Sequence, residues 1–165
     1  MPCRGGIFRP ASGKKRKRMS ATIRIAVCDD NSRELAMLQQ LLQQYFEAHP
    51  LQEHQISAYA SPCSLQERLA AGESYDLYIL DILMPEISGI DIGRLVRRQS
   101  ANAPILYTTS SREYALDAYE NHALRYLIKP FRREEFAAAM DFALSVLHER
   151  AARCYTVRSR DGLVS

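Results

Sequence analysis

The sequence predicts an α/β fold: a flavodoxin-like (βα)5 three-layer sandwich with a parallel sheet of strand order 2-1-3-4-5. Short apolar segments alternate five times with segments of helical apolar spacing between residues 23 and 150. The third apolar segment, YDLYIL, has no polar face, which is typical of a strand buried on both sides of a parallel sheet. Five alternating units with right-handed crossovers lead to the expected strand order.

The first half of the pattern contains two strands and two helices. IRIAVC (residues 23–28) predicts the first strand, and the helix after it takes Asn31 as its N-cap. Glu34 follows three residues later, which is the spacing of a capping box. Pro50 ends this helix. HQISAY predicts the second strand, and SLQERLAAG predicts a second helix that stops at Gly72.

The second half supplies the remaining three units. YDLYIL leads into Asp81, and IDIGRLVRRQ predicts a third helix that Gly93 weakens. PILYT and RYLI predict the fourth and fifth strands, with a helix over SREYALDAYENH between them. The last helix is expected from about Arg132 to Arg150. CYTVRSRDGLVS then reads as a strand, a D-G turn and the beginning of another strand.

The composition argues against a membrane protein, an exported protein and a DNA-binding domain. No apolar run approaches the roughly 20 residues that span a bilayer, and the N-terminus lacks a signal-peptide core, so we expect a cytoplasmic protein. The net charge of +3 comes from the first 18 residues, which hold seven of the 22 Lys and Arg and no acid. The remaining chain has 15 basic and 19 acidic side chains and therefore no electrostatic footprint for DNA.

Residues 1–20 are expected to form a disordered basic leader. They are rich in Gly, Pro and Arg without periodicity, and KKRKR is a pattern of nucleic-acid binding or nuclear import. The alternative is a tag or a mis-assigned start, with Met19 as the natural first residue. The four cysteines and four histidines have no spacing typical of a metal site or a disulfide framework.

Polar side chains close the apolar strands. Because the carboxyl ends of parallel strands meet at one edge of the sheet, we expect these side chains to converge there. They comprise three carboxylates, a threonine hydroxyl and a lysine amine: Asp29, Asp30, Asp81, Thr108 or Thr109, and Lys129.

This group of residues predicts phosphoryl chemistry. Three carboxylates repel one another unless cations offset their charge, and Mg²⁺ is a hard cation that prefers oxygen ligands. A carboxylate such as Asp81 is a competent nucleophile toward phosphorus. Lys129 and a threonine hydroxyl would then contact the phosphoryl oxygens.

Four motifs in order make residues 23–148 resemble the receiver domain of two-component response regulators: VCDD, LDILMPEISG, PILYTTS and YLIKPF. The resemblance implies that Asp81 accepts a phosphoryl group from a sensor histidine kinase. It also implies Mg²⁺ ligands on Asp29, Asp30 and Asp81, and on the backbone carbonyl of Leu83. Such a protein is a phospho-acceptor and not an enzyme in the usual sense.

The resemblance also implies a switch. Thr109 matches the switch hydroxyl, Lys129 the lysine that contacts the phosphate, and Tyr126 the aromatic switch residue. In this family the face made by the fourth helix, fifth strand and fifth helix changes with phosphorylation and can form a homodimer. Arg125 replaces the acid that commonly precedes Tyr126, which could alter that face.

The segment TSSREYALDAYENHALRYLIKPF is similar to the LytR/AgrA-type (LytTR) subgroup, whose output domain binds DNA. The expected domains are therefore the leader (1–20), a receiver (21–150), and a linker with the first strands of a missing LytTR-type domain (151–165). DNA binding would belong to that missing domain, and transcription regulation to the longer parent protein.

The sequence leaves two other functions open. A haloacid-dehalogenase-like phosphatase also uses a nucleophilic Asp and Mg²⁺, but it needs a second Asp where Leu83 stands. A receiver-like interaction module that takes no phosphate is the other alternative. The complete set of acidic, hydroxyl and lysine residues argues against such a degenerate module.

Overall fold

In the computed structural model, which describes residues 21–160, five strands alternate with five helices. All strand pairs are parallel, and the sheet order is β2-β1-β3-β4-β5, as predicted. The elements in chain order are β1 (Ile23–Cys28), α1 (Ser32–Glu47), β2 (His54–Tyr59), α2 (Pro62–Ala70), β3 (Leu77–Asp81), α3 (Gly89–Gln99), β4 (Ile105–Thr109), α4 (Ala115–Glu120), β5 (Arg125–Ile128) and α5 (Arg133–Arg160).

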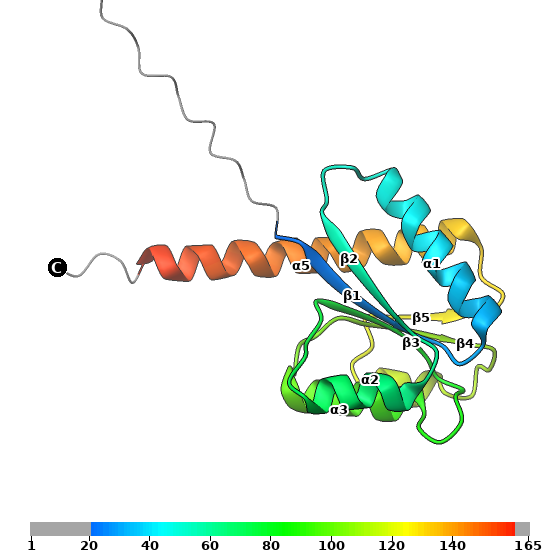
Figure 1. Cartoon of the computed structure of the whole chain (residues 1–165). Helices are drawn as coiled ribbons and strands as arrows, with labels where there is room; N and C mark the ends of the chain where they lie inside the picture. The colour runs from blue at the N-terminus through cyan, green and yellow to red at the C-terminus, as the bar shows by residue number, and fades with distance from the viewer. Residues whose placement is uncertain (1–20, 161–165) are drawn as a thin grey trace, which may run out of the picture.

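The helices form two layers around the sheet. One layer consists of α1 and α5, and the other contains α2 and α3 (Figure 1). Each layer has its own hydrophobic core: Leu38 and Phe136 belong to the first, and Leu65 and Ile92 to the second. Every residue of β3 and β4 is buried, because helices cover these central strands on both faces.

Gly93, which weakens α3 on propensity alone, has a packing role. A Cβ atom at this position would overlap the hydroxyl of Tyr107 and the side-chain amide of Asn121. These two groups are buried and hydrogen-bonded to each other. Glycine therefore allows α3 to lie close to β4.

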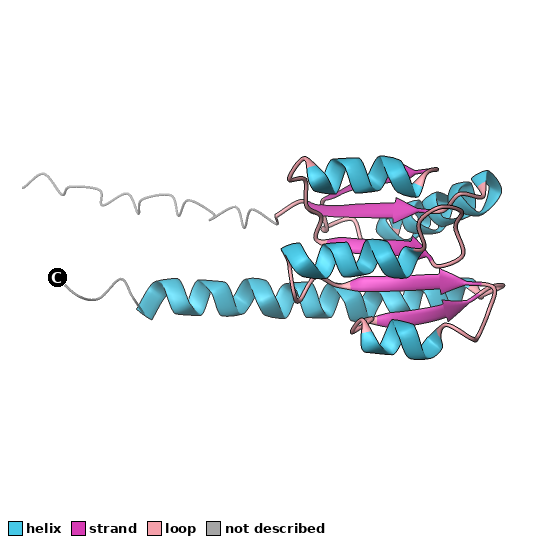
Figure 2. Cartoon of the chain, turned by 90° about the horizontal axis from the view of Figure 1, so that it is seen from below, coloured by secondary structure: helices cyan, strands magenta, loops and turns pink. Residues whose placement is uncertain are grey.

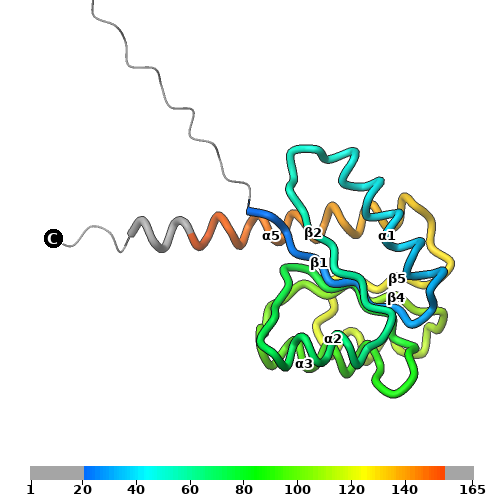
Figure 3. The backbone as a smooth tube through the Cα atoms, in the orientation of Figure 1, coloured from blue at the N-terminus to red at the C-terminus, as the bar shows by residue number. Residues whose placement is uncertain are grey.

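All five strands run toward the same end of the sheet (Figure 2). The loops that follow β1, β3 and β4 gather at this end, and α5 leaves the domain at the opposite end (Figure 3). The candidate site therefore lies at one end of the molecule.

Two expectations about helices are corrected. The fourth helix covers only Ala115–Glu120 instead of residues 111–122, since a turn precedes it. The fifth helix continues past Arg150 to Arg160, so the strand expected over residues 154–160 is wrong. The predicted leader at 1–20 and the D-G turn lie outside the described residues. No helix among residues 21–160 combines the length and apolar character needed to cross a membrane.

Candidate functional site

Three carboxylates converge at the carboxyl end of the sheet. Oxygen atoms of Asp29, Asp30 and Asp81 all lie within 4.8 Å of one another. Asp29 follows β1 and is fully buried, Asp81 ends β3 with 4% of its surface exposed, and Asp30 is exposed. The predicted convergence of these side chains is thus confirmed, and it leaves an acidic cluster with one face open to solvent.

Lys129 compensates part of this charge. Its Nζ atom donates hydrogen bonds to Asp29 Oδ2 (2.8 Å) and Asp81 Oδ1 (3.2 Å), and only 9% of its side chain is exposed. The backbone N–H of Lys129 donates to the carbonyl of Thr109, at 2.8 Å, which fixes the lysine beside the end of β4. Asp81 is therefore a buried carboxylate paired with a buried ammonium group.

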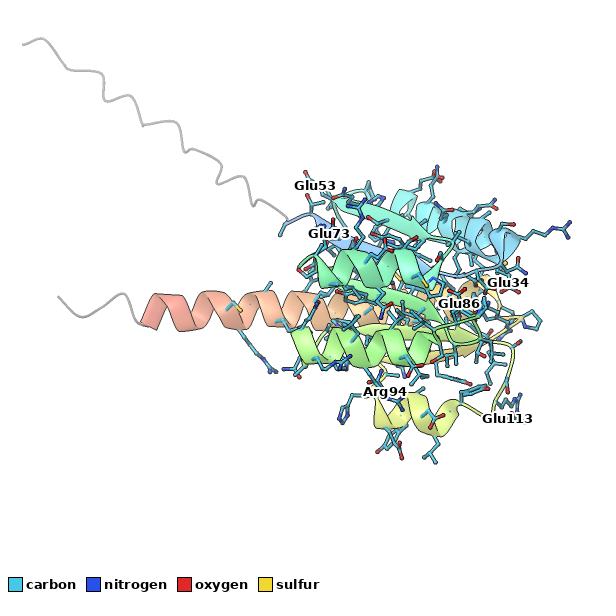
Figure 4. The ribbon with its side chains drawn as sticks, turned by 60° about the horizontal axis from the view of Figure 1, so that its bottom comes forward. Glu34, Glu53, Glu73, Glu86, Arg94 and Glu113 are labelled. Carbon is cyan, nitrogen blue, oxygen red and sulfur yellow. The ribbon has the colours of Figure 1, made fainter. Side chains whose placement is uncertain are left out.

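Glu34 is a member of this cluster that the sequence reasoning missed. Its carboxylate forms a third ion pair with Lys129 Nζ. The expected capping box is only half formed: Asn31 Oδ1 accepts from the N–H of Glu34 (3.3 Å), while the Asn31 N–H donates to Asp29 Oδ1 (2.9 Å). Figure 4 shows Glu34 at the end of the molecule toward which the strands run, far from Glu53 and Glu73.

One signal in the sequence points to Glu34. It stands in the first turn of the helix that directly follows the acidic pair at the end of β1. A side chain of its length can reach the site from there.

Burial is the largest influence on the pKa values of the buried carboxyl groups in the cluster. Burial raises the pKa of Asp81 to about 6, against a lowering by Lys129 and further raising by Asp29 and Glu34. The pKa of Asp29 is also raised, chiefly by burial. For Lys129, hydrogen bonds to Asp29 and Glu34 outweigh burial and raise its pKa. The pair is therefore held as carboxylate and ammonium by mutual attraction, at a cost in desolvation.

The donor set fits a hard divalent cation. Three carboxylates gathered from two strand ends carry more negative charge than Lys129 can offset. Carboxylate oxygens are the ligands that Mg²⁺ takes in proteins. Leu83, whose carbonyl is the fourth predicted ligand, lies two residues after Asp81 in an exposed position of the following loop. Its metal-binding role stays a prediction.

The predicted switch residues lie beside the acidic cluster. Thr109 is fully buried at the end of β4, and its hydroxyl oxygen accepts from the N–H of Ser111 at 3.2 Å. Tyr126 in β5 is half-buried, and its hydroxyl donates to the carbonyl of Ser111. Thr108 pairs with Asp81 across the sheet, and its hydroxyl is buried with no hydrogen-bond partner among the described residues. The switch roles of Thr109 and Tyr126 stay predictions.

A family model of the response regulator receiver domain matches residues 25–141. This range includes all the residues of the site described above.

Curated relatives agree with this match over part of the chain. The sensory transduction protein LytT of Oceanobacillus iheyensis is 34% identical over 80 residues, covering 47% of this chain and 32% of that protein. The positive alginate biosynthesis regulatory protein of Pseudomonas aeruginosa is 34% identical over 65 residues, covering 39% of this chain and 26% of that protein. The chain thus spans about a third or less of the length of these two relatives.

Solved structures show the same fold. The BeF3-activated DrrB receiver domain superposes with a TM-score of 0.61 at 24% identity and covers 76% of this chain and 99% of its own. The response regulatory domain of protein mrkE from Klebsiella pneumoniae gives 0.68 at 16% identity, covering 77% of this chain and 99% of its own. At these identities the likeness concerns the fold alone.

Proposed function

Because this chain belongs to the response regulator receiver family, we propose that it accepts a phosphoryl group on Asp81 from a sensor histidine kinase. Receiver domains are phospho-acceptor signalling domains of two-component systems and bind Mg²⁺ through an acidic pocket. The observation that carries the proposal is the ion pair of Asp81 with Lys129 inside the acidic cluster.

Asp29, Asp30, Asp81 and the carbonyl of Leu83 would hold the Mg²⁺ ion. When bound, this ion supplies positive charge that offsets the carboxylates and the phosphoryl oxygens. Lys129 supplies a further positive charge through its ion pairs with Asp29 and Asp81. Its burial strengthens that interaction, because a charge in a site with little water is weakly screened.

The chemical step is a substitution at phosphorus. A carboxylate oxygen of Asp81 forms a bond to the phosphorus atom of the donor. The bond from phosphorus to the donor's leaving group breaks, and the leaving group keeps the electron pair. The product is an acyl phosphate on Asp81, which adds negative charge and acceptor oxygens at the end of β3.

Phosphorylation is followed by movement of side chains on the neighbouring strands β4 and β5. The Thr109 hydroxyl gives up the bond that it accepts from the Ser111 N–H and donates one to a phosphoryl oxygen, and Tyr126 moves into the space that Thr109 leaves. This changes the face formed by α4, β5 and α5. A partner that binds one state of this face more tightly then responds to phosphorylation. A second copy of the chain is one candidate partner for that face.

The output lies beyond this chain in our proposal. Relatives such as LytT support assignment to the LytTR subgroup, and residues 151–165 would lead from the receiver (21–150) into a DNA-binding domain. Transcription regulation and DNA binding then belong to the longer protein. The family also supports a location in the cytoplasm, where histidine kinases present their phosphohistidine.

Phosphorylation by a small phosphodonor tests the proposal directly. The protein is incubated with acetyl phosphate and Mg²⁺, and the mass of the intact chain is measured. We expect one phosphoryl group on the wild type, none on Asp81→Asn, and normal labelling of Asp91→Asn, which alters an exposed carboxylate on α3. Labelling of Asp81→Asn would move the acceptor to another residue. A wild type that is never labelled would favour the phosphate-independent interaction module.

A further inference from the structure

We propose that Glu34 is a positioning residue: it holds Lys129 away from an incoming phosphoryl group and thereby slows phosphorylation of Asp81. The inference rests on the proposed function and deepens it, because it names a residue of this chain that regulates the same site. It begins from the ion pair between Glu34 and Lys129.

The ammonium group of Lys129 has no donor to spare. A lysine ammonium has three N–H donors, and the three acceptors of Lys129 Nζ are carboxylates of Asp29, Glu34 and Asp81. A phosphoryl oxygen can therefore receive a hydrogen bond from this group only after one of the three carboxylates is released.

Burial decides which carboxylate is released. The Asp29 side chain is fully buried and that of Asp81 is 6% exposed, so either of them would lose a partner where water cannot replace it. The Glu34 side chain is 38% exposed, so water can solvate its carboxylate when the ion pair breaks. Glu34 is thus the partner that Lys129 gives up.

The charge of Glu34 acts in the same direction. It adds a fourth carboxylate to a site that must receive an anionic phosphoryl group, although it stands outside the three groups that share a candidate cation position. Its negative charge repels the phosphodonor and competes with it for Lys129. Both effects raise the barrier to phosphorylation; neutralising the carboxylate removes the repulsion and weakens the competition for Lys129.

If the role of Glu34 were purely structural, its removal would change stability and not the rate of phosphorylation. A carboxylate in the first turn of α1 interacts favourably with the helix dipole, so its removal would lower stability. It would leave the rate of phosphorylation unchanged at a fixed fraction of folded protein. Rate and stability must therefore be measured on the same samples.

The test is the rate of labelling by acetyl phosphate in Glu34→Gln, with Mg²⁺ at a saturating level established for each variant by calorimetry. We expect labelling about two- to fivefold faster than in wild type, the range that a half-exposed ion pair supports. Glu34→Asp keeps the charge and should bring the rate back toward the wild-type value. Glu47→Gln, in the last turn of the same helix, should label at the wild-type rate.

A double-mutant cycle shows whether the effect runs through the lysine. In a Lys129→Ala background, Glu34→Gln should give a smaller acceleration than in wild type, because no ammonium group remains to be released. An equal acceleration in both backgrounds would overturn the positioning role.

Folded Glu34→Gln that labels at or below the wild-type rate would also overturn the inference, and lowered stability alone would assign Glu34 a structural role. If Glu34→Gln does not fold, Glu34→Ala decides, because it also removes the carboxylate, suits a helix and should also speed labelling. A wild type that takes no label would refute the proposed function instead, and is thereby distinguished from failure of this inference.

Discussion

The two sides of the site are held together very differently. The acidic side, formed by Asp29, Asp30, Asp81 and Lys129, consists of charges brought together from the ends of β1, β3 and β5. The hydroxyl side is formed by Thr109, Tyr126 and the segment from Ser111 through α4, and the neutral hydroxyls of Thr109 and Tyr126 each bond to the backbone of Ser111. The first side is suited to chemistry and the second to movement.

Contacts and burial support this division. On the acidic side, Lys129 alone makes three ion pairs while 9% of its side chain is exposed. On the hydroxyl side, α4 has six residues, its N-cap Tyr114 makes no side-chain capping bond, and Ala118 is its one buried residue. A short helix with one buried side chain loses little packing when it shifts. A tightly paired group of charges thus lies beside a segment that is held loosely enough to shift.

The largest expected effect comes from Lys129→Ala, which removes the three ion pairs of the lysine on the acidic side. Without divalent cations, it should lower the free energy of unfolding by about 3 kcal/mol, because buried carboxylates lose their compensating charge. Mg²⁺ should still bind and restore part of the loss, whereas the phosphorylated form should no longer switch.

Urea unfolding with EDTA or with Mg²⁺ measures the stability of this variant. Arg132→Ala, which removes a side chain that is 77% exposed three residues away, serves as the control. Loss of Mg²⁺ binding in Lys129→Ala would give the lysine a different role.

The pH dependence of stability should be intermediate in size. Since burial raises the pKa of Asp81 to about 6, the folded state keeps its proton at pH values where the unfolded chain has lost it. Stability without Mg²⁺ should therefore fall as pH rises from about 4 to about 6. Asp81→Asn lacks this titration and should be more stable than wild type at pH 7.5, by at most about 3 kcal/mol.

Urea unfolding of both proteins in EDTA, between pH 4 and pH 8, checks this prediction. The two stability curves should converge near pH 4 and separate as the pH rises. Parallel curves over this range would show that Asp81 is no more costly to ionise in the folded protein than in the unfolded chain.

The smallest effect is expected on the hydroxyl side. Tyr126→Phe removes one hydrogen bond to the Ser111 carbonyl and should cost about 1 kcal/mol of stability, with the rate of labelling at Asp81 unchanged. Tyr119→Phe, in which the ring is 79% exposed, should change neither quantity. Slower labelling of Tyr126→Phe would show that the hydroxyl side takes part in the chemistry, and the two sides would then not have separate roles.

Most of the fold could be predicted from local patterns in the sequence. The bounds of β1, β2 and β5 coincide with the apolar segments identified in the sequence, and the strand order follows from the alternation of strands and helices. The gathering of Asp29, Asp30 and Asp81 was predictable for the same reason, since parallel strands place their carboxyl ends at one edge.

Two features were missed, one because it depends on a distant contact and one because two local patterns compete. The reach of Glu34 to Lys129 joins residues 95 positions apart, so helix spacing alone could not choose this partner over a capping bond. The extension of α5 competes with a hairpin signal over residues 154–165. A lone hairpin is marginally stable, whereas each residue added to an existing helix gains a hydrogen bond.

The length of α5 has a mechanical consequence. The helix begins four residues after Lys129 and runs for 28 residues, which corresponds to about 42 Å at the rise of an α-helix. A tilt of about 5° at its first turn would displace its far end by about 4 Å, following from that rise. The helix can therefore act as a lever that enlarges an ångström-scale adjustment near Lys129 into a displacement of several ångströms at its far end.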